Sequence, residues 1–239
     1  MVVIIPVYIF NEEILQLTKN AIESLGDVGL VIVDNGSPIG GGYLRSVSEI
    51  YLRSKENKGY AHAVNSGLSL IHNDLVAIAN NDIRVSPNWL SVTQEVFEEP
   101  NVYSCHFRMT NYDEPFQYGK DIVYQGKERW CTSSFFVIKT CDEKGNLRKF
   151  YYDENFVNSY DDWSYWKDVR SHGLKQAYTD RACYQHKHSS TQVLLPTREE
   201  QNQKNREYFK KKWGMYPEDD FNKDFPDQMK KEYWEGFQI

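Results

Sequence analysis

The chain alternates between short apolar runs and segments whose apolar residues recur at helical spacing. Nearly continuous apolar runs predict strands that are buried on both faces of a sheet, and they cover residues 2–7, 29–37 and 74–80. Helical spacing or a helix start signal marks the segments between and after them, which cover residues 11–25, 43–52, 61–71 and 87–99. Strands separated by helices predict an α/β fold with a parallel, doubly wound sheet.

Two residues delimit the first predicted helix. Asn11 precedes it and is a good N-cap, because its side-chain oxygen can accept a hydrogen bond from a free backbone N–H of the first turn. Gly26 follows it and can adopt the left-handed conformation that ends many helices. The helix is therefore expected to connect the first two strands.

The pattern changes after Pro100. Strand-like segments follow one another without strong intervening helices, at residues 101–107, 121–126 and 132–139. A helix with Gly173 as its stop, a strand and a charged helix are predicted at residues 160–173, 174–188 and 197–213. The last residues, 218–239, are acidic and aromatic without a clear period. We therefore expect a smaller mixed region that packs on the first sheet.

Composition limits the classes of protein. The chain has 239 residues, of which 40% are hydrophobic and 26% charged, and this is enough for one substantial core. A net charge of -6 argues against a nucleic-acid binder, which normally shows a basic excess. The four cysteines are widely spread without a C-x-x-C pair, which favours reduced structural thiols and a cytoplasmic protein.

The apolar start of the chain is too short to cross a membrane. Pro6 and the polar residues Asn11 to Glu13 interrupt it, and no basic residue precedes it, so we interpret it as a buried strand rather than a signal peptide. No other segment reaches the ~20 apolar residues of a transmembrane helix. We expect no membrane span, although peripheral contact with a membrane is compatible with the sequence.

Polar residues stand at the carboxyl ends of two of the predicted buried strands. Asp34, Asn35, Gly36 and Ser37 end one strand, and the triplet Asn80-Asn81-Asp82 ends another. In open α/β sheets, ligands bind beyond the carboxyl ends of the strands. Asp34 could accept the ring N–H of a uracil or thymine base, although Asp-Asn-Gly-Ser is also strong turn chemistry. The sequence has neither a G-x-G-x-x-G after the first strand nor a P-loop motif, so a dinucleotide-binding site and a P-loop nucleotide site both lose their main support.

Six segments in a fixed order carry a resemblance to a known family. They read VVIIPVY, NEEILQLTKNAIESL, LVIVDNGS, NKGYAHAVNSGLSL, LVAIANNDIRVSPNWL, and YDDWSYWKDVRSHG followed by CYQHKH. Together they resemble glycosyltransferase family 2, the inverting enzymes of GT-A fold that use nucleotide-sugar donors. The Asn-Asn-Asp triplet resembles the rhamnosyltransferase-like branch of that family.

The resemblance implies a divalent metal, Mn²⁺ or Mg²⁺. The family carries an Asp-x-Asp element whose last carboxylate binds the metal on the donor diphosphate, and here only Asp82 keeps the charge. One carboxylate is enough if the diphosphate completes the shell of oxygen ligands. A histidine closes the site in the family, and His186 matches it best, with His188 as the alternative. A polar turn that merely ends the strand is the other interpretation of the triplet.

The resemblance also implies a binding site for the nucleotide sugar. Its residues lie at the strand ends and in the loop before the predicted helix 61–71, and they are Pro6, Tyr8, Asp34, Asn35, Asn57, Gly59, Asn80 and Asn81. Gly59 would let the backbone approach the nucleotide where a Cβ would block it. The same segment can also be a plain helix start.

The pair Asp161-Asp162 resembles the family's acidic pair ahead of a helix. The second member is the family's usual catalytic base, which assigns that role to Asp162, with Asp161 as the rival. Alternatively, one of the two acids only caps the helix. A helix N-terminus lowers the pKa of a carboxylate, whereas burial raises it, so the two effects oppose each other here.

We therefore expect an inverting glycosyltransferase that moves a sugar from a UDP- or dTDP-activated donor to a hydroxyl of a saccharide acceptor. The GT-A domain would span residues 1–213, with a nucleotide-sugar half at about 1–100 and an acceptor half at about 101–195, followed by a tail at 214–239. Two alternatives stay open. One is a catalytically silent sugar-nucleotide or glycan-binding module, and the other is a sugar-nucleotide pyrophosphorylase, which would need a Gly-rich basic loop where this chain has the acidic PVYIFNEE.

Overall fold

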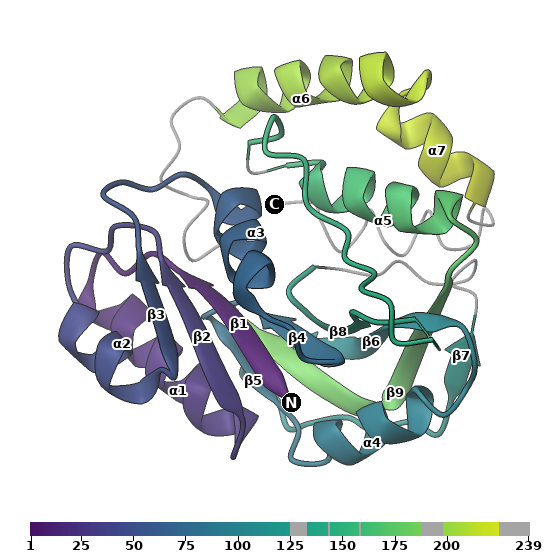
Figure 1. Cartoon of the computed structure of the whole chain (residues 1–239). Coiled ribbons are helices and arrows are strands. Elements are labelled where there is room, and N and C mark those ends of the chain that lie inside the picture. The colour runs from purple at the N-terminus through teal and green to yellow at the C-terminus, as the bar shows by residue number, and fades with distance from the viewer. Residues whose placement is uncertain (125–132, 143, 158, 188–197, 225–239) are drawn as a thin grey trace.

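A single mixed sheet runs through the computed structural model, which describes residues 1–124, 133–142, 144–157, 159–187 and 198–224 (Figure 1). Within these residues the strand order is β3-β2-β1-β4-β8-β6-β9-β5, and β7 also pairs with β9. The strands are β1 (Val2–Val7), β2 (Gly29–Asp34), β3 (Ile50–Arg53), β4 (Leu75–Ala79), β5 (Ile83–Val85), β6 (Val102–Asn111), β7 (Ile122–Tyr124), β8 (Phe135–Lys139) and β9 (Lys175–His186).

The half of the sheet built from β1 to β4 is parallel. β1 pairs with β2 on one side and β4 on the other, and β3 continues the sheet beyond β2. The carboxyl ends of these strands therefore lie at one edge, where Asp34 and Asn80 are found. The predicted α/β fold with a doubly wound parallel region is confirmed.

The other half is mixed, as expected for the residues after Pro100. β8 runs antiparallel to both β4 and β6, whereas β6 and β9 are parallel. The short strand β5 pairs antiparallel with the end of β9, so that Ile83 lies opposite His186. This pairing brings the polar triplet at 80–82 next to the far end of the chain's longest described strand.

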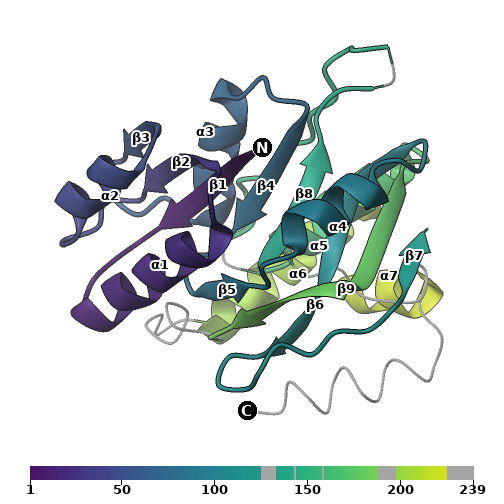
Figure 2. The same ribbon diagram turned by 90° about the horizontal axis from the view of Figure 1, so that it is seen from below.

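Helices cover both faces of the sheet. They are α1 (Glu12–Leu25), α2 (Gly41–Val47), α3 (Tyr60–Leu70), α4 (Trp89–Val96), α5 (Asp161–Ser171), α6 (Arg198–Trp213) and α7 (Pro217–Asp224). Figure 2 shows α1 and α4 in front of the sheet, and their apolar side chains belong to one core cluster with Val3, Ile5 and Ile32. α3 and α5 belong to a second cluster with Ile4 and Val31 on the opposite face. Alternate residues of the same strands thus serve two cores, which explains their continuous apolar runs.

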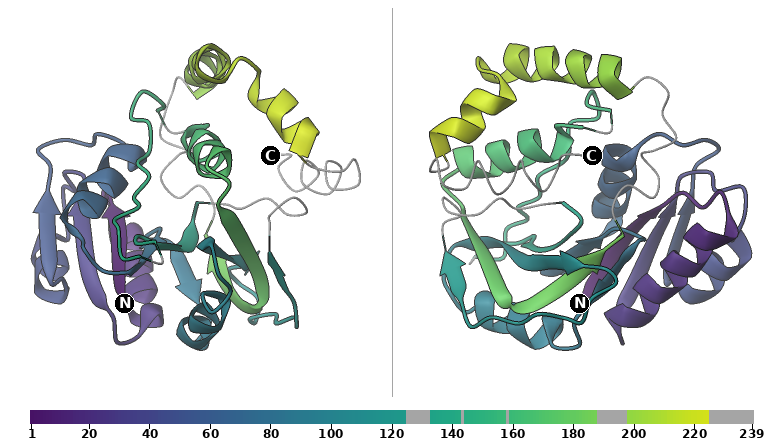
Figure 3. Two further views of the ribbon diagram at one scale, coloured as in Figure 1. Left: turned by 45° about the vertical axis from the view of Figure 1, so that its right-hand side comes forward. Right: turned by 180° about the vertical axis from the view of Figure 1, so that it is seen from behind.

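The last two described helices form an additional layer. α6 lies over α5 on the side away from the sheet, and α7 continues beside it (Figure 3). The predicted charged helix is confirmed at 198–213. α7 was not predicted, because its sequence shows no apolar period, and it falls in the segment expected to be a tail.

The predicted caps of α1 are also confirmed. Asn11 Oδ1 accepts a hydrogen bond from the Ile14 N–H at 2.9 Å, and Gly26 has a positive φ of 77°. Cys105, Cys141 and Cys183 are free thiols, whereas Cys131 lies outside the described residues. Among the helices that the structure describes, none has the length and apolar character needed to traverse a bilayer.

One predicted helix is wrong in its second half. The segment 43–52 forms α2 only as far as Val47, and Ile50–Arg53 is the edge strand β3. The apolar residues Ile50, Tyr51 and Leu52 favour a strand, and pairing with β2 overrides the helical spacing. β5 was missed as well, because a three-residue strand is too short to show a period.

Candidate active site

Asp34 ends β2, and its carboxylate is fully buried among donors. Its Oδ1 accepts a hydrogen bond from the Ser37 N–H at 2.7 Å, and its Oδ2 accepts one from the Tyr51 hydroxyl at 2.6 Å. The Arg53 guanidinium forms an ion pair with Oδ2. The carboxylate therefore joins the turn after β2 to the end of β3, and three of its roughly four acceptor positions are taken by groups of the chain itself.

Asn35 connects this turn to the loop before α3. Its Nδ2 donates to the Gly59 carbonyl at 3.1 Å, and its backbone N–H donates to Val7 O, between Pro6 and Tyr8, at 2.8 Å. Asn57 Oδ1 accepts the Gly59 N–H at 2.9 Å, and Gly59 has a φ of 90° and a ψ of 170°, which a residue with a Cβ rarely adopts. The structure thus brings together six residues predicted for the nucleotide-sugar site.

Asp82 and His186 face each other across the β5–β9 pairing. His186 Nε2 lies 3.1 Å from Asp82 Oδ1, and both side chains are largely buried. The other ring nitrogen, Nδ1, lies 3.3 Å from the Ser134 hydroxyl, which fixes the orientation of the imidazole. The two predicted metal ligands are therefore neighbours in space although 104 positions separate them in the sequence.

The two amides of the triplet point to different partners. Asn80 donates its backbone N–H to Ser134 O at 2.8 Å, and its side-chain oxygen is buried without a hydrogen-bond partner among the described residues. Asn81 donates its Nδ2 to Thr18 Oγ1 of α1 at 3.0 Å. The Asn80 oxygen is therefore available to a ligand, whereas the Asn81 amide anchors the triplet to α1. The predicted contact of Asn81 with the nucleotide sugar stays a prediction.

Ser133 connects α3 and α5 through hydrogen bonds. Its carbonyl accepts a hydrogen bond from the Tyr60 hydroxyl at 2.7 Å, and its Oγ contacts the Tyr152 hydroxyl at 3.1 Å and Trp166 Nε1 at 3.3 Å. Tyr60 directly follows Gly59, and Trp166 belongs to α5. Ser133 and Ser134 therefore link the loop before α3, the helix with the acidic pair and the Asp82–His186 contact.

The acidic pair begins α5. Asp161 is buried and Asp162 is partly buried. Burial raises the pKa of Asp161 to about 6, and burial together with the charge of Asp161 raises the pKa of Asp162 to about 7. The backbone N–H groups of the first turn lower both pKa values but do not offset burial. Burial raises the pKa of Tyr60, and the charges of both acids raise it further.

Neither acid is the N-cap of this helix. That position belongs to Tyr160, which has a φ of 61° and makes no side-chain capping bond, and the helix starts at Asp161. Neither acid therefore occupies the N-cap position itself, and the choice between a catalytic and a helix-capping role for the pair stays a prediction. Asp162 Oδ1 instead accepts the N–H of the next residue, Trp163, at 2.8 Å.

The residues at the triplet fit a divalent cation bound together with a substrate. Two adjacent ligands of one octahedral cation, each at about 2.1 Å, stand about 3 Å apart, which matches the separation of Asp82 Oδ1 and His186 Nε2. The side-chain oxygen of Asn80, which has no hydrogen-bond partner among the described residues, is a third candidate ligand and lies in the same segment as Asp82. In the part of the chain that the structure describes, no three His, Cys, Asp or Glu side chains gather as a metal site. The protein ligands would thus need phosphate oxygens and water to complete a shell.

Several residues of this edge were missed from the sequence. Arg53 and Tyr51 were missed because their strand was predicted as a helix, and Tyr60 because aromatic residues mostly serve packing. The adjacent glycine and the polar tip of Tyr60 are the signal that could have found it. His188 lies outside the described residues, so the choice between it and His186 stays a prediction.

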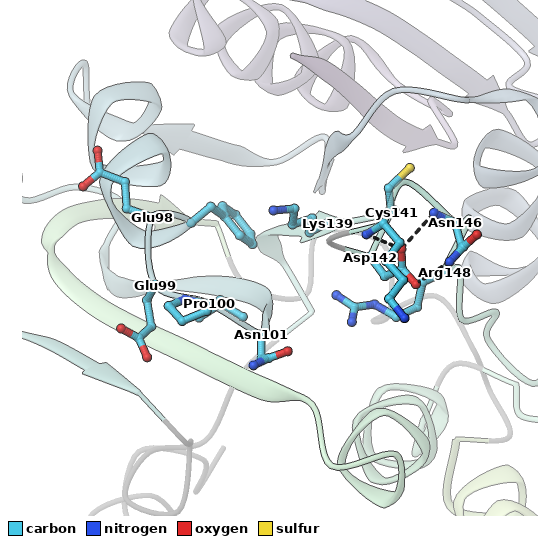
Figure 4. A pocket seen from close by; sticks show the side chains of 12 residues that line it. Glu98, Glu99, Pro100, Asn101, Lys139, Cys141, Asp142, Asn146 and Arg148 are labelled. Carbon is cyan, nitrogen blue, oxygen red and sulfur yellow. Dashed lines mark hydrogen bonds between the residues drawn. The ribbon is translucent and has the colours of Figure 1, made fainter.

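A separate cavity of about 440 Å³ lies at the opposite edge of the sheet (Figure 4). It is lined by the segment 97–102 and by residues at the end of β8 and shortly after it, among them Lys139, Asp142 and Arg148. Acidic and basic side chains are mixed in it, and none of the predicted site residues contributes to it. It is therefore distinct from the site at the strand ends.

A family model and several solved structures match this chain. The family model described as "Glycosyl transferase family 2" matches residues 2–167. No curated protein sequence matches the chain significantly.

Solved structures match the fold at low sequence identity. S. aureus TarS 1-349 superposes with a TM-score of 0.60 and 13% identity, covering 77% of this chain and 59% of its own. The mannosyltransferase PcManGT from Pyrobaculum calidifontis, in complex with GDP-Man and Mn²⁺, gives 0.57 and 15%, covering 80% and 57%. GalNAc-T7 with UDP, GalNAc and Mn²⁺ gives 0.58 and 12%, covering 77% and 43%. The chain thus spans less than two thirds of the length of each of these proteins.

Proposed function

The chain belongs to glycosyltransferase family 2, and from this membership we propose that it transfers a sugar from a nucleotide-sugar donor to a hydroxyl of a saccharide acceptor with inversion at the anomeric carbon. The observation that carries the proposal is the convergence at one sheet edge of a buried carboxylate, the Asp82–His186 contact and an acidic pair of raised pKa. We propose UDP or dTDP as the nucleotide, and a rhamnosyltransferase-like enzyme because of the Asn-Asn-Asp triplet.

The nucleotide would lie beside β1, β2 and the loop before α3. Pro6, Tyr8, Asp34 and Asn35 stand at the strand ends there. Gly59 would let the loop backbone approach the donor. Support comes from two related structures, S. aureus TarS in complex with UDP-GlcNAc and PcManGT with GDP-Man and Mn²⁺.

The donor diphosphate would lie near the triplet. Asp82 and His186 would hold Mn²⁺ or Mg²⁺ there, with Asn80 beside them. When bound, a divalent cation stabilises negative charge on a departing diphosphate. Ser134 would keep the imidazole in place through its contact with Nδ1.

The acceptor would approach from the side of α5. Its hydroxyl oxygen attacks the anomeric carbon and forms the new C–O bond, while the bond to the diphosphate oxygen breaks and that oxygen leaves with the electron pair. The hydroxyl proton passes to the carboxylate of Asp162, with Asp161 as the rival base. Attack opposite to the leaving group inverts the configuration. A pKa near 7 suits a carboxylate that must accept a proton near neutral pH.

We propose the domain division on the same grounds. Residues 1–213 would form the GT-A domain, with halves at about 1–100 and 101–195, and residues 214–239 would follow it as a C-terminal segment that contains α7.

A donor screen tests the proposal directly. The protein is incubated with UDP-, dTDP- and GDP-sugars, with and without Mn²⁺ and with a panel of saccharide acceptors, and the released nucleotide is measured. Acceptor-dependent release with one donor class supports the proposal. Binding of a nucleotide sugar without transfer or hydrolysis would instead support a catalytically silent binding module.

Replacing Asp34 tests the nucleotide side of the site. We expect Asp34→Ala to raise the donor KM by about tenfold or more with a much smaller change in kcat, because the lost hydrogen bond to the base exists in both ground and transition states. Steady-state kinetics with varied donor measures both constants.

Tyr51→Phe is the matched control for this variant. It removes one donor to the Asp34 carboxylate but keeps the carboxylate itself. An equal rise in KM in both variants would mean that Asp34 acts by holding β3 in place, and an unchanged KM in Asp34→Ala would exclude the contact with the base.

A further inference from the structure

The segment that leads into the acidic pair is held by one buried side chain of α6. Asn205 is 2% exposed, and its Nδ2 lies 2.8 Å from Val157 O, 3.0 Å from Ser159 O and 2.7 Å from Ser159 Oγ. Its Oδ1 accepts a hydrogen bond from Gln201 Nε2 at 2.9 Å, which orients the amide. The carbonyls of Val157 and Ser159 thus obtain partners from a helix 46 to 48 residues later in the chain.

Tyr160, the residue after Ser159, has a strained backbone conformation that neighbouring contacts must hold. Tyr160 adopts the left-handed conformation, with a φ of 61° and a ψ of -2°, which disfavours residues that carry a Cβ. The Tyr160 side chain makes no capping hydrogen bond to the helix that starts after it. A strained conformation of this kind persists only where the surrounding contacts fix it, and Asn205 supplies contacts immediately before it.

α6 and α7 also contact α5 itself. Lys212 Nζ and Trp213 Nε1 each donate to the Oγ of Ser164 at 3.1 Å, and this buried serine follows Asp162 by two residues. Asp220 of α7 is buried against Lys167 and Arg170 of α5. α6 and α7 therefore contact α5 before, within and after its first turn, on the face away from the sheet (Figure 3).

These helices lie outside the part of the chain that the family model matches, which ends at residue 167. We propose that Asn205 is a positioning residue for the acidic pair, and that α6 and α7 belong to the acceptor half of the site rather than to an appended tail. The inference rests on the proposed function, because it gives Asn205 its effect through Asp162. If it is correct, transfer requires α6 and α7 in addition to the residues at the strand ends.

A double-mutant comparison tests this role. Asn205→Ala is expected to lower kcat by about 10- to 100-fold with little change in donor KM, since a displacement of the base by about 1 Å has effects of this size. In an Asp162→Asn background the same change should have no further effect on kcat. Gln203→Ala is the matched control, because this exposed amide lies on the same helix and donates a hydrogen bond to Glu207 of that helix. An equal loss in both backgrounds, or no loss in either, would overturn the proposal.

A second measurement does not depend on turnover. In protein labelled with carboxyl-¹³C aspartate, the Asp162 signal, assigned by its absence from Asp162→Asn, is titrated between pH 3 and 9. Asn205→Ala should move the pKa of Asp162 toward its ordinary value near 4, because a displaced pair becomes more hydrated. An unchanged titration refutes the positioning role even if no donor supports transfer. If Asn205→Ala does not fold, Ser159→Ala, which removes one of the three oxygens, takes its place with the same expected direction.

Discussion

Replacing Asp162 with Asn is expected to lower kcat by about 10²- to 10⁴-fold while the donor KM stays near its native value. The amide keeps the shape of the side chain and its acceptor oxygen for the Trp163 N–H, but it cannot take a proton from the acceptor hydroxyl. The proposed site for the nucleotide-sugar donor consists of residues at the strand ends and in the loop before α3, which the change does not touch. Initial rates with varied donor and saturating acceptor give both constants.

The pH dependence follows from the same carboxylate. The base must be ionised, so activity should rise with pH through an apparent pKa near 7, well above the ordinary value of an aspartate. The two acids titrate as a pair, and the rising limb therefore reports both of them. In Asp162→Asn the residual rate should lose this limb. A native profile that rises near pH 4 would contradict the burial of the pair as a feature of the active enzyme.

Asp161→Asn is the control within the pair. Removing the charge of Asp161 should lower the pKa of Asp162, because that charge is the second cause of its elevation after burial. The rising limb then shifts to lower pH while much of kcat is retained. If instead Asp161→Asn abolishes transfer and Asp162→Asn does not, the base is Asp161. If neither matters, the acceptor is activated by another group.

Removal of the metal is expected to have the other large effect. Transfer should fall by about 100-fold or more in EDTA and return with Mn²⁺ or Mg²⁺, and Asp82→Asn should cause a comparable loss that the ions do not restore. Asp82 carries the only charge of the triplet, and an amide in its place would keep the volume and the contact with His186 but not the negative charge. Initial rates across a metal titration measure the effect.

Two further variants distinguish the loss of a metal ligand from the loss of any nearby negative charge. Asp113→Asn removes a largely exposed acid that forms an ion pair with Lys187, and it should leave the metal dependence unchanged. Asn80→Asp restores a second carboxylate and should tighten binding of Mn²⁺ in the absence of donor, measured by calorimetry. Full activity of the native protein in chelator would instead assign stabilisation of the leaving group to cationic side chains or helix N-termini.

Local patterns predicted the parallel half of the fold well. β1, β2 and β4 are buried on both faces, so their apolar runs are long and unmistakable, and Asn11 and Gly26 mark α1 through chemistry confined to a few neighbouring residues. β3 failed for the opposite reason. It is a partly exposed edge strand whose identity depends on pairing with β2, and such pairing leaves no local signal.

The candidate site shows the same division. Strand ends and the acidic pair are visible in the sequence, because each is a short run of characteristic residues. Their connections are not, since the contacts of Ser134 with His186 and of Tyr60 with Ser133 join segments 52 and 73 residues apart. The raised pKa of the acidic pair also depends on burial by distant elements, and a sequence pattern does not contain it.

The acidic pair also has a consequence for the stability of the fold. Because the pKa values of Asp161 and Asp162 are raised above those of the unfolded chain, the native state binds more protons than the unfolded state between about pH 4 and 7. The contribution of the pair to the free energy of unfolding is fully present below pH 4 and is lost as the pH rises through about 7. The proposed base is thus ionised, and ready to act, in the pH range where the pair no longer stabilises the native state. Proton uptake links the two properties, so a chain selected for a more stable fold at neutral pH would tend to lose its base.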